Sequence, residues 1–411
     1  MIQYFIRRLL LAIPTFFGAT LVVFLVAQYA PGGPYEQQIN ALKKGQGSEG
    51  AGSAFGTETM AIPKSQLEAL QRYYQVNKTP IERYLIWLGI LPRPVNDYRA
   101  TIGEPRNVGG GLRVIVRKAG DGSYQVVRAD DPSSVLDGWF VDPSEEPNSV
   151  WVHQRSRRGI LTFDFGDSFT YRKPVTELIA SRIPVSAQFG LIGFIITYVI
   201  CFYLGTQKAL KHGSAFDVVT SSIVLIAFSI PGWALGAVLL VLLGGGSFLE
   251  LFPTGGFQSS DYESLNLFER IADRTWYFVL PTVAYTIGGF ASTTLLMKNS
   301  LLETMGQDFV RTAYAKGLRE ERVIWLHAMR NSIIPLVASI GGIIGIFLAG
   351  SYLIEYAFNI DGIGKLSFEA VLQRDTNVFF AFAVISILIT LIGSIISDFV
   401  LALVDPRIRF R

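Results

Sequence analysis

The chain has 411 residues, of which 50% are hydrophobic and only 17% are charged. This balance is far more apolar than that of an ordinary soluble domain. The formal net charge of +3 is too small to indicate nucleic acid as a partner. A single cysteine excludes a disulfide within one chain, and three scattered histidines without ligand spacing argue against a metal site.

The first thirty residues combine a basic pair with a long apolar run. Arg7 and Arg8 precede residues 9–30, which are long enough to cross about 30 Å of hydrocarbon as a helix. A secretory signal peptide is the alternative, but the apolar part is too long and no small-x-small cleavage site follows. We therefore predict that residues 1–30 comprise a cytoplasmic N-terminus and a first transmembrane helix.

Residues 31–184 are a different kind of sequence, mixed in charge and without a run that could span a bilayer. Residues 45–56 have the composition of a flexible, Gly-rich linker. Helical spacing is found at residues 65–74 and 80–88. Alternating segments predict a small β module at residues 112–117, 124–128, 150–154 and 159–163. With the N-terminus inside, this α+β insertion is expected to be extracytoplasmic. It would be either a solvated loop or a platform for a substrate-delivery protein.

Apolar runs return at regular intervals in residues 185–411. Five further spans are expected, at residues 185–205, 218–243, 276–297, 333–354 and 378–404. Pro231 and Gly232 predict a kink in the second of these five. Residues 244–275 and 355–376 are expected to be outward loops. The predicted fold class is therefore an all-α membrane protein with six transmembrane helices and an α+β insertion between helices 1 and 2.

Lysine and arginine in the connecting segments support one orientation of these spans. The basic residues at the two ends, in the loop after residue 205 and in residues 298–330 all fall on the same side. They include Arg7, Arg8, Lys208, Lys211, Arg407, Arg409 and Arg411. Because cytoplasmic loops are enriched in Lys and Arg, both termini are predicted to be cytoplasmic.

A polar, basic segment at residues 298–332 interrupts the apolar runs. Gly317 is placed to end one short helix in a left-handed cap, and residues 319–331 have the pattern of a second helix. The small residues Ala313, Ala315 and Gly317 would let another protein approach the backbone closely. The basic residues keep the segment out of the membrane. The segment is therefore predicted to be a cytoplasmic docking element.

Polar side chains within the spans are candidates for a substrate pathway. Hydroxyl groups could line such a path, or they could form hydrogen bonds between packed helices, which is their commoner use. Asp398 lies inside the last span, where an ionisable group suggests function. A structural pair with a nearby Lys or Arg is the weightier alternative. The pathway candidates are Tyr285, Thr286, Ser292, Thr293 and Asp398.

No catalytic constellation is found in the sequence. Gly364 and Lys365 are followed by Leu366, where a phosphate-binding loop needs Ser or Thr. The chain is therefore not expected to hydrolyse ATP, and the energy for transport would come from a partner.

Several motifs resemble the permease subunits of ABC importers. Arg311-Thr312-Ala313, Gly317 and Arg330-Asn331 are similar to the EAA loop of these permeases in the version found in the peptide branch, with Arg and Thr in place of the name-giving Glu and Ala. Other segments are similar to the first permease of dipeptide and oligopeptide importers, and some are most similar to its Yej-type branch. These include Ala30-Pro31-Gly32-Gly33-Pro34, Phe163-Asp164-Phe165-Gly166-Asp167-Ser168, Lys208-Ala209, Phe216-Asp217, Leu251-Phe252-Pro253, Glu355, Phe358, Gly362 and Gly364. Residues 91–160 carry no such resemblance.

The resemblance implies a type I ABC-importer permease fold in a bacterial inner membrane. It implies three kinds of partner, which are a second homologous permease subunit, two ATP-binding domains and an extracytoplasmic peptide-binding protein. It implies no cofactor and no metal. It assigns ATPase coupling to Arg311, Thr312, Ala313, Lys316, Gly317, Arg319, Arg330 and Asn331. A secondary transporter, or a permease of the same family for nickel or another small solute, is the alternative.

Overall fold

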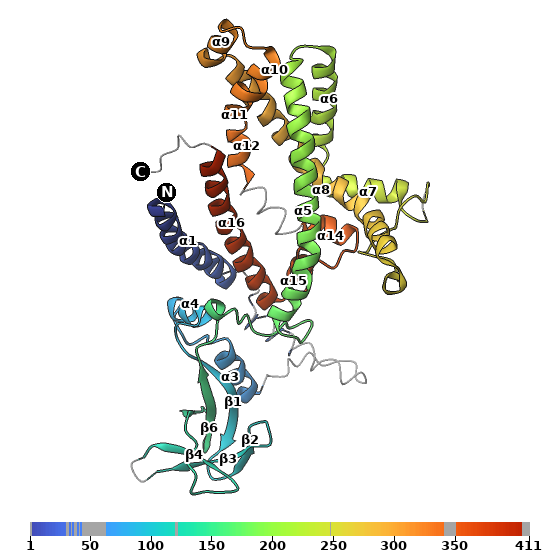
Figure 1. The fold of residues 1–411 in the computed structure, drawn as a ribbon. Helices are drawn as coiled ribbons and strands as arrows, with labels where there is room; N and C mark the ends of the chain where they lie inside the picture. Colours follow the sequence, from blue (N-terminus) through green and yellow to red (C-terminus); the bar gives the residue numbers. More distant parts are fainter. Residues whose placement is uncertain are drawn as a thin grey trace. The chain divides into compact units, whose positions relative to one another are not determined.

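The computed structural model describes residues 2–29, 33, 35–36, 39–40, 42, 63–119, 122–246, 248–340 and 351–404. Two compact units make up the chain (Figure 1). The first, here called the helical unit, consists of Met1–Thr20 and Asp167–Arg411, and the second, the α+β unit, is Leu21–Gly166. The Gly-rich segment 45–56 and the C-terminal basic residues Arg407, Arg409 and Arg411 lie outside the described residues.

Long apolar helices are the main elements of the chain. Among the described residues, four helices are long and apolar enough to cross a membrane, and a bent pair makes a possible fifth span. The four are α1 (Ile2–Tyr29), α5 (Val175–Leu210), α8 (Leu267–Met305) and α16 (Thr376–Val404). The span expected at residues 333–354 includes residues 341–350, which lie outside the described part. The count of six therefore stays a prediction.

The kink expected at Pro231 is a full break. The helices α6 (Ala215–Ser229) and α7 (Gly232–Leu243) meet at an angle of 93°. Proline lacks the N–H that would continue the hydrogen-bond ladder of α6. Glycine follows because α7 packs closely on α8, so that a Cβ at Gly232 would collide with the carbonyl oxygen of Ala284.

Three boundaries expected from the sequence were wrong. Helix α5 begins at Val175 rather than at residue 185 and contains Pro184. Helix α8 begins at Leu267, inside the segment expected to be a loop, and Asn266 caps its N-terminus. The loop expected at residues 355–376 contains the second half of α14 (Tyr352–Ala357) and all of α15 (Ile363–Leu372). In each case tertiary packing stabilises a helix in sequence that is less apolar than a span.

Among its described residues, the helical unit has two separate apolar cores. One joins α5, α8 and α14, where the rings of Phe189 and Phe278 stack with centroids 4.0 Å apart. The other packs residues of the polar segment 298–332 against Met297 and Leu301 of α8. This second core includes residues of α9 (Asp308–Ala315), the π-helix η3 (Val323–Ala328), α11 (Met329–Ser332) and α12 (Ile334–Ala338).

Among its described residues after α1, the α+β unit has the helices α3 and α4 and two three-stranded antiparallel sheets (Figure 1). The helices are α3 (Lys64–Tyr73) and α4 (Pro80–Leu88), and Thr79 begins α4 with a capping box to Glu82. One sheet has the order β1-β6-β5 and the other β2-β3-β4. The strands are β1 (Arg93–Thr101), β2 (Pro105–Asn107), β3 (Arg113–Lys118), β4 (Tyr124–Arg128), β5 (Trp139–Pro143) and β6 (Ser149–Ser156).

The sequence predicted part of this unit correctly. Both helices, the β3–β4 hairpin and β6 are confirmed, whereas β1, β2 and β5 were not predicted. The strand expected at residues 159–163 is wrong, because Ile160–Thr162 form a 3-10 turn. A short apolar run cannot be assigned to strand or helix by its periodicity alone.

Candidate functional site

The polar segment folds as two short helical pieces joined at a glycine. Helix α9 ends at Ala315, and Gly317 follows with a φ of +74°, which is the left-handed conformation expected for the cap. The backbone N–H of Gly317 donates to the carbonyl of Tyr314 at 2.9 Å. The second piece runs from α10 (Glu320–Arg322) through η3 to α11. The helix–cap–helix prediction is therefore confirmed.

Helix α9 has a buried face and an exposed face. Val310 and Ala313 are buried in the second core of the helical unit, with Leu301 and Met329 among its members. Ala313 therefore packs inside this chain. Its small size had suggested that another protein could approach it closely, but its burial prevents this. Two aromatic side chains, Phe309 and Tyr314, are instead 41% and 40% exposed.

The remaining coupling candidates lie on α9, directly after it and at the end of the second helical piece. Four of them are cationic, each of the other three directly follows a cationic residue in the sequence, and most are exposed. Arg311, Thr312, Lys316, Gly317, Arg319 and Arg330 are exposed, and Asn331 is half-buried. A Cβ added at Gly317 would meet no atom of this chain within 4 Å. The remaining candidates on α9 and directly after it are thus exposed, largely basic and next to exposed aromatic groups in the sequence, which is the composition of many protein interfaces.

An ion cluster that sequence reasoning missed lies among α5, α6 and α8. Lys298 donates to both carboxylate oxygens of Asp217 at 2.7 and 2.8 Å. Lys208 lies 3.3 Å from the same carboxylate and donates to the Ser221 hydroxyl at 2.6 Å. Lys208 was expected in a cytoplasmic loop, but it belongs to α5 and is 0% exposed. The cluster connects three helices near the start of the polar segment.

Glu355 is the centre of a second buried polar cluster. One of its carboxylate oxygens accepts hydrogen bonds from the Ser186 hydroxyl at 2.8 Å and from the Tyr285 hydroxyl at 2.9 Å. The other accepts from the backbone N–H of Lys365 at 2.9 Å. These contacts join α5, α8, α14 and α15. A Cβ at Gly362 would collide with both Glu355 and Ser186, which explains the glycine at this position.

The pathway candidates are not brought together in one site. Tyr285 belongs to the Glu355 cluster. Thr286, Ser292 and Thr293 donate to carbonyl groups of their own helix, those of Val283 and Gly289, at 2.8–3.2 Å. Such bonds satisfy a hydroxyl inside an apolar helix without a substrate.

Asp398 has a structural partner on another helix. Its carboxylate lies 2.9 Å from the guanidinium of Arg8 on α1, and 15% of its side chain is exposed. This ion pair is the structural alternative that the sequence left open. An ionisable group inside a span is stable when it is paired in this way.

The described residues include no group of three or more His, Cys, Asp or Glu side chains that could hold a metal ion. The chemistry of both buried clusters is that of structural ion pairs and hydrogen bonds. Neither cluster contains a nucleophile next to a base in an open site, as covalent catalysis requires.

Comparison with known proteins identifies similar chains. The family described as "Binding-protein-dependent transport system inner membrane component" matches residues 189–410. The peptidoglycan transport system permease protein YejB of Agrobacterium fabrum is 32% identical over 99% of this chain and 98% of its own length. The inner membrane ABC transporter permease protein YejB of Escherichia coli O157:H7 is 33% identical, with the same coverage of both chains. The oligopeptide transport system permease protein AppB of Bacillus subtilis is 31% identical over 73% of this chain and 93% of its own length.

These matches confirm the resemblance to peptide permeases and to the Yej-type branch. The two YejB proteins align over 99% of the chain, whereas AppB aligns over 73%. The alignments with the two YejB proteins are therefore long enough to include much of residues 91–160, the block that showed no resemblance by motif.

Proposed function

Because this chain belongs to the family of binding-protein-dependent transport system inner membrane components, we propose that it is the membrane permease subunit of an ATP-driven importer of peptides. The observation that carries the proposal is the match to two Yej-type permeases over 99% of the chain. Family members of this kind are transport components rather than enzymes.

The proposed assembly has three kinds of partner. A second homologous permease subunit completes the pathway, two ATP-binding domains dock on the cytoplasmic side, and an extracytoplasmic peptide-binding protein delivers the substrate. The chain lies in a bacterial inner membrane with both termini in the cytoplasm and the α+β unit outside. The apolar helices α1, α5, α8 and α16 and the broken pair α6 and α7 support this arrangement. Transport proceeds by alternating access.

The surface of α9 is the proposed contact with the ATP-binding domains. It is supported by the exposed rings of Phe309 and Tyr314 beside Arg311, because exposed aromatic and arginine side chains are enriched in interfaces. The buried Val310 and Ala313 anchor α9 to the core that contains Met297 of α8. A movement of the docked ATPase would be transmitted through this core to α8.

The test is purification of the tagged chain from detergent-solubilised native membranes, followed by mass spectrometry of the proteins that copurify. We expect an ATP-binding protein, a second permease and a peptide-binding protein. The chain recovered alone, and able to drive uptake into liposomes without ATP, would make it a secondary transporter. Uptake of nickel rather than peptides by the intact assembly would overturn the substrate class.

A further inference from the structure

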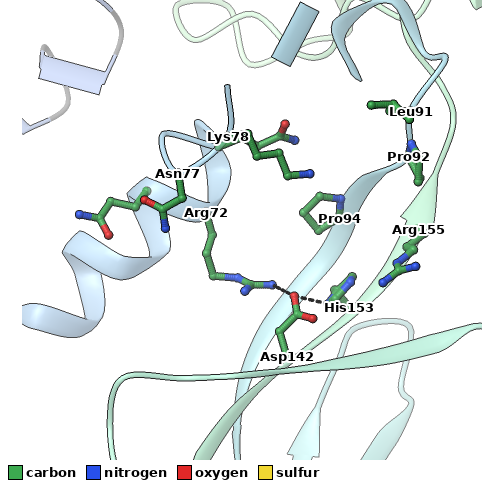
Figure 2. Close-up of a pocket in the computed structure, with 11 residues that line it drawn as sticks. Arg72, Asn77, Lys78, Leu91, Pro92, Pro94, Asp142, His153 and Arg155 are labelled. Atoms are coloured by element: carbon green, nitrogen blue, oxygen red, sulfur yellow. Dashed lines mark hydrogen bonds and ion pairs between the residues drawn. The ribbon is translucent and has the colours of Figure 1, made fainter. Parts of the chain in front are cut away.

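The α+β unit contains a cavity of about 320 Å³ that the proposed transport function does not explain. It lies between α3 with the following turn and the strands β1, β5 and β6 (Figure 2). Leu91, Pro92 and Pro94 form an apolar wall, whereas Arg72, Lys78 and Arg155 bring three positive charges to the lining. Its volume is that of a pocket for a small molecule or for part of a larger ligand.

The first of the three cations is already neutralised. Arg72 lies 2.9 Å from the Asp97 carboxylate and 2.9 Å from that of Asp142, and its guanidinium stands over the ring of Trp151. This network fixes the side chain in one orientation, as Figure 2 shows for the pair with Asp142. Arg72 therefore lines the cavity, but its positive charge is already paired with carboxylates of this chain.

The other two cations are available to a ligand. Within the described residues, neither Lys78 nor Arg155 has a carboxylate within 4 Å, and Arg155 is held with its guanidinium 4.0 Å from the centre of the Phe140 ring. The three cations and the two carboxylates of Asp97 and Asp142 leave a net charge of +1 around the cavity. A single negative charge on a ligand would balance it.

A buried imidazole also belongs to the lining. The side chain of His153 is 4% exposed, and its Nδ1 atom is buried without a hydrogen-bond partner among the described residues. The nearest carboxylate oxygen, Oδ2 of Asp142, is 3.7 Å away, which is too far for a good hydrogen bond. Burial lowers the pKa of His153, and this effect outweighs the neighbouring Asp142 and Asp97 carboxylates, so the ring is neutral at neutral pH. An unsatisfied buried polar atom is costly, and in the tautomer with the proton on Nδ1 a ligand oxygen would remove that cost.

We propose that this cavity binds the C-terminal carboxylate of a peptide. Lys78 and Arg155 supply the charge, the Nδ1–H of His153 donates to one carboxylate oxygen, and the wall of Leu91, Pro92 and Pro94 contacts the last side chain. A planar carboxylate matches the fork of a guanidinium, and a monoanion matches the net charge better than a phosphate dianion does. The inference that this carboxylate belongs to a peptide rests on the proposed function.

The experiment measures binding of trialanine and of trialanine amide to the purified full-length chain in detergent by isothermal titration calorimetry. We expect trialanine to bind and its amide to bind at least about tenfold more weakly, since one charge-assisted contact is worth that much. Arg155→Gln and Lys78→Gln should each weaken trialanine binding by a similar factor. Arg117→Gln, an exposed arginine on β3 outside the lining, is the matched control and should bind as the unaltered chain does.

Besides the absence of any binding, three outcomes would overturn the proposal. These are equal binding of the acid and the amide, binding that survives both Arg155→Gln and Lys78→Gln, and displacement of trialanine by an equal concentration of inorganic phosphate. The proposed function is tested separately by the copurifying partners and by ATP-dependent uptake. A chain that assembles and transports peptides but shows no such cavity binding would refute this site alone. Arg155→Lys, which keeps the charge but not the guanidinium fork, should bind trialanine more tightly than Arg155→Gln does, which would show that the loss is not due to misfolding.

Discussion

In the helical unit the buried charges of Lys208, Asp217 and Glu355 all have partners on other helices, whereas in the α+β unit Lys78 and Arg155 face a cavity without a carboxylate partner among the described residues. The difference follows from what surrounds each charge. A charge removed from water and packed among helices is tolerated only with a partner and hydrogen bonds. At a cavity open to water, a cation can remain unpaired and bind an anion.

Charged residues have different roles in the two units. In the helical unit, charged residues determine which helices stay together, and their removal should act on stability. In the α+β unit, the free cations should act on binding with little effect on stability. Four predictions test the stability and coupling part of this contrast.

The largest effect is expected for Glu355→Ala. The change leaves the hydroxyls of Ser186 and Tyr285 and the N–H of Lys365 without their acceptor in a fully buried site. At about 1–3 kcal/mol for each unsatisfied group, we expect a loss of stability on the order of 4 kcal/mol. Thermal unfolding of the purified protein in detergent measures it. Glu303→Ala, on the exposed face of α8, is the control, and a melting temperature of Glu355→Ala equal to that of Glu303→Ala would show that the cluster is not structural.

The next effect is expected for Asp217→Ala, which removes the carboxylate shared by Lys208 and Lys298. Two ammonium groups of like sign would then be left together, one of them completely buried. Breaking a buried pair in this way costs about 3 kcal/mol. The same unfolding assay applies, with the exposed Asp261→Ala as the matched control. An unchanged unfolding temperature would mean that water replaces the carboxylate at little cost.

Gly317→Arg should act on coupling rather than on the fold of this chain. A residue other than glycine at a φ of +74° costs about 1 kcal/mol, but an added side chain meets nothing in this chain within 4 Å. Only a docked partner would be blocked. We expect at least about a tenfold loss of peptide-stimulated ATPase activity in the assembled complex, or about 1.4 kcal/mol. Gly317→Asn, which tolerates the left-handed conformation, should keep most of the activity. Full activity of the Arg variant would refute the docking assignment.

The smallest effect concerns pH and the α+β unit. Because burial lowers the pKa of His153 below its ordinary 6.5, the folded state disfavours the protonated ring. Its contribution to stability is therefore complete above pH 6.5 and is lost as the pH falls from there toward the folded-state pKa. Hydrogen exchange of the β6 amides, corrected for the intrinsic effect of pH, should show weaker protection on the acidic side. His153→Phe should remove the part of this change that depends on the histidine. An identical pH dependence in the variant would mean that other groups cause it.

Local pattern was enough to predict many elements of this chain. The apolar runs within α1, α5, α8 and α16, the cap at Thr79 and the left-handed turn at Gly317 all depend on residues that lie within a few positions of one another. For the same reason the sequence predicted the helix–cap–helix fold of the segment that we propose as a docking element. It placed Ala313 wrongly because nothing local says which face of a short helix packs on its own chain.

The contacts that define the two charge environments join residues far apart in the sequence. Lys298 and Asp217 are 81 positions apart, Asp398 and Arg8 are 390 apart, and Arg72 and Asp142 are 70 apart. No spacing or composition rule predicts such pairs. The sequence alone determined the membrane class, the family resemblance and the helix–cap–helix segment, since these depend on periodicity and motif. Only the tertiary structure decided that Lys208 is buried, that the Tyr285 hydroxyl donates to Glu355 and that three cations line a cavity. The reason is that burial depends on which distant segments pack together.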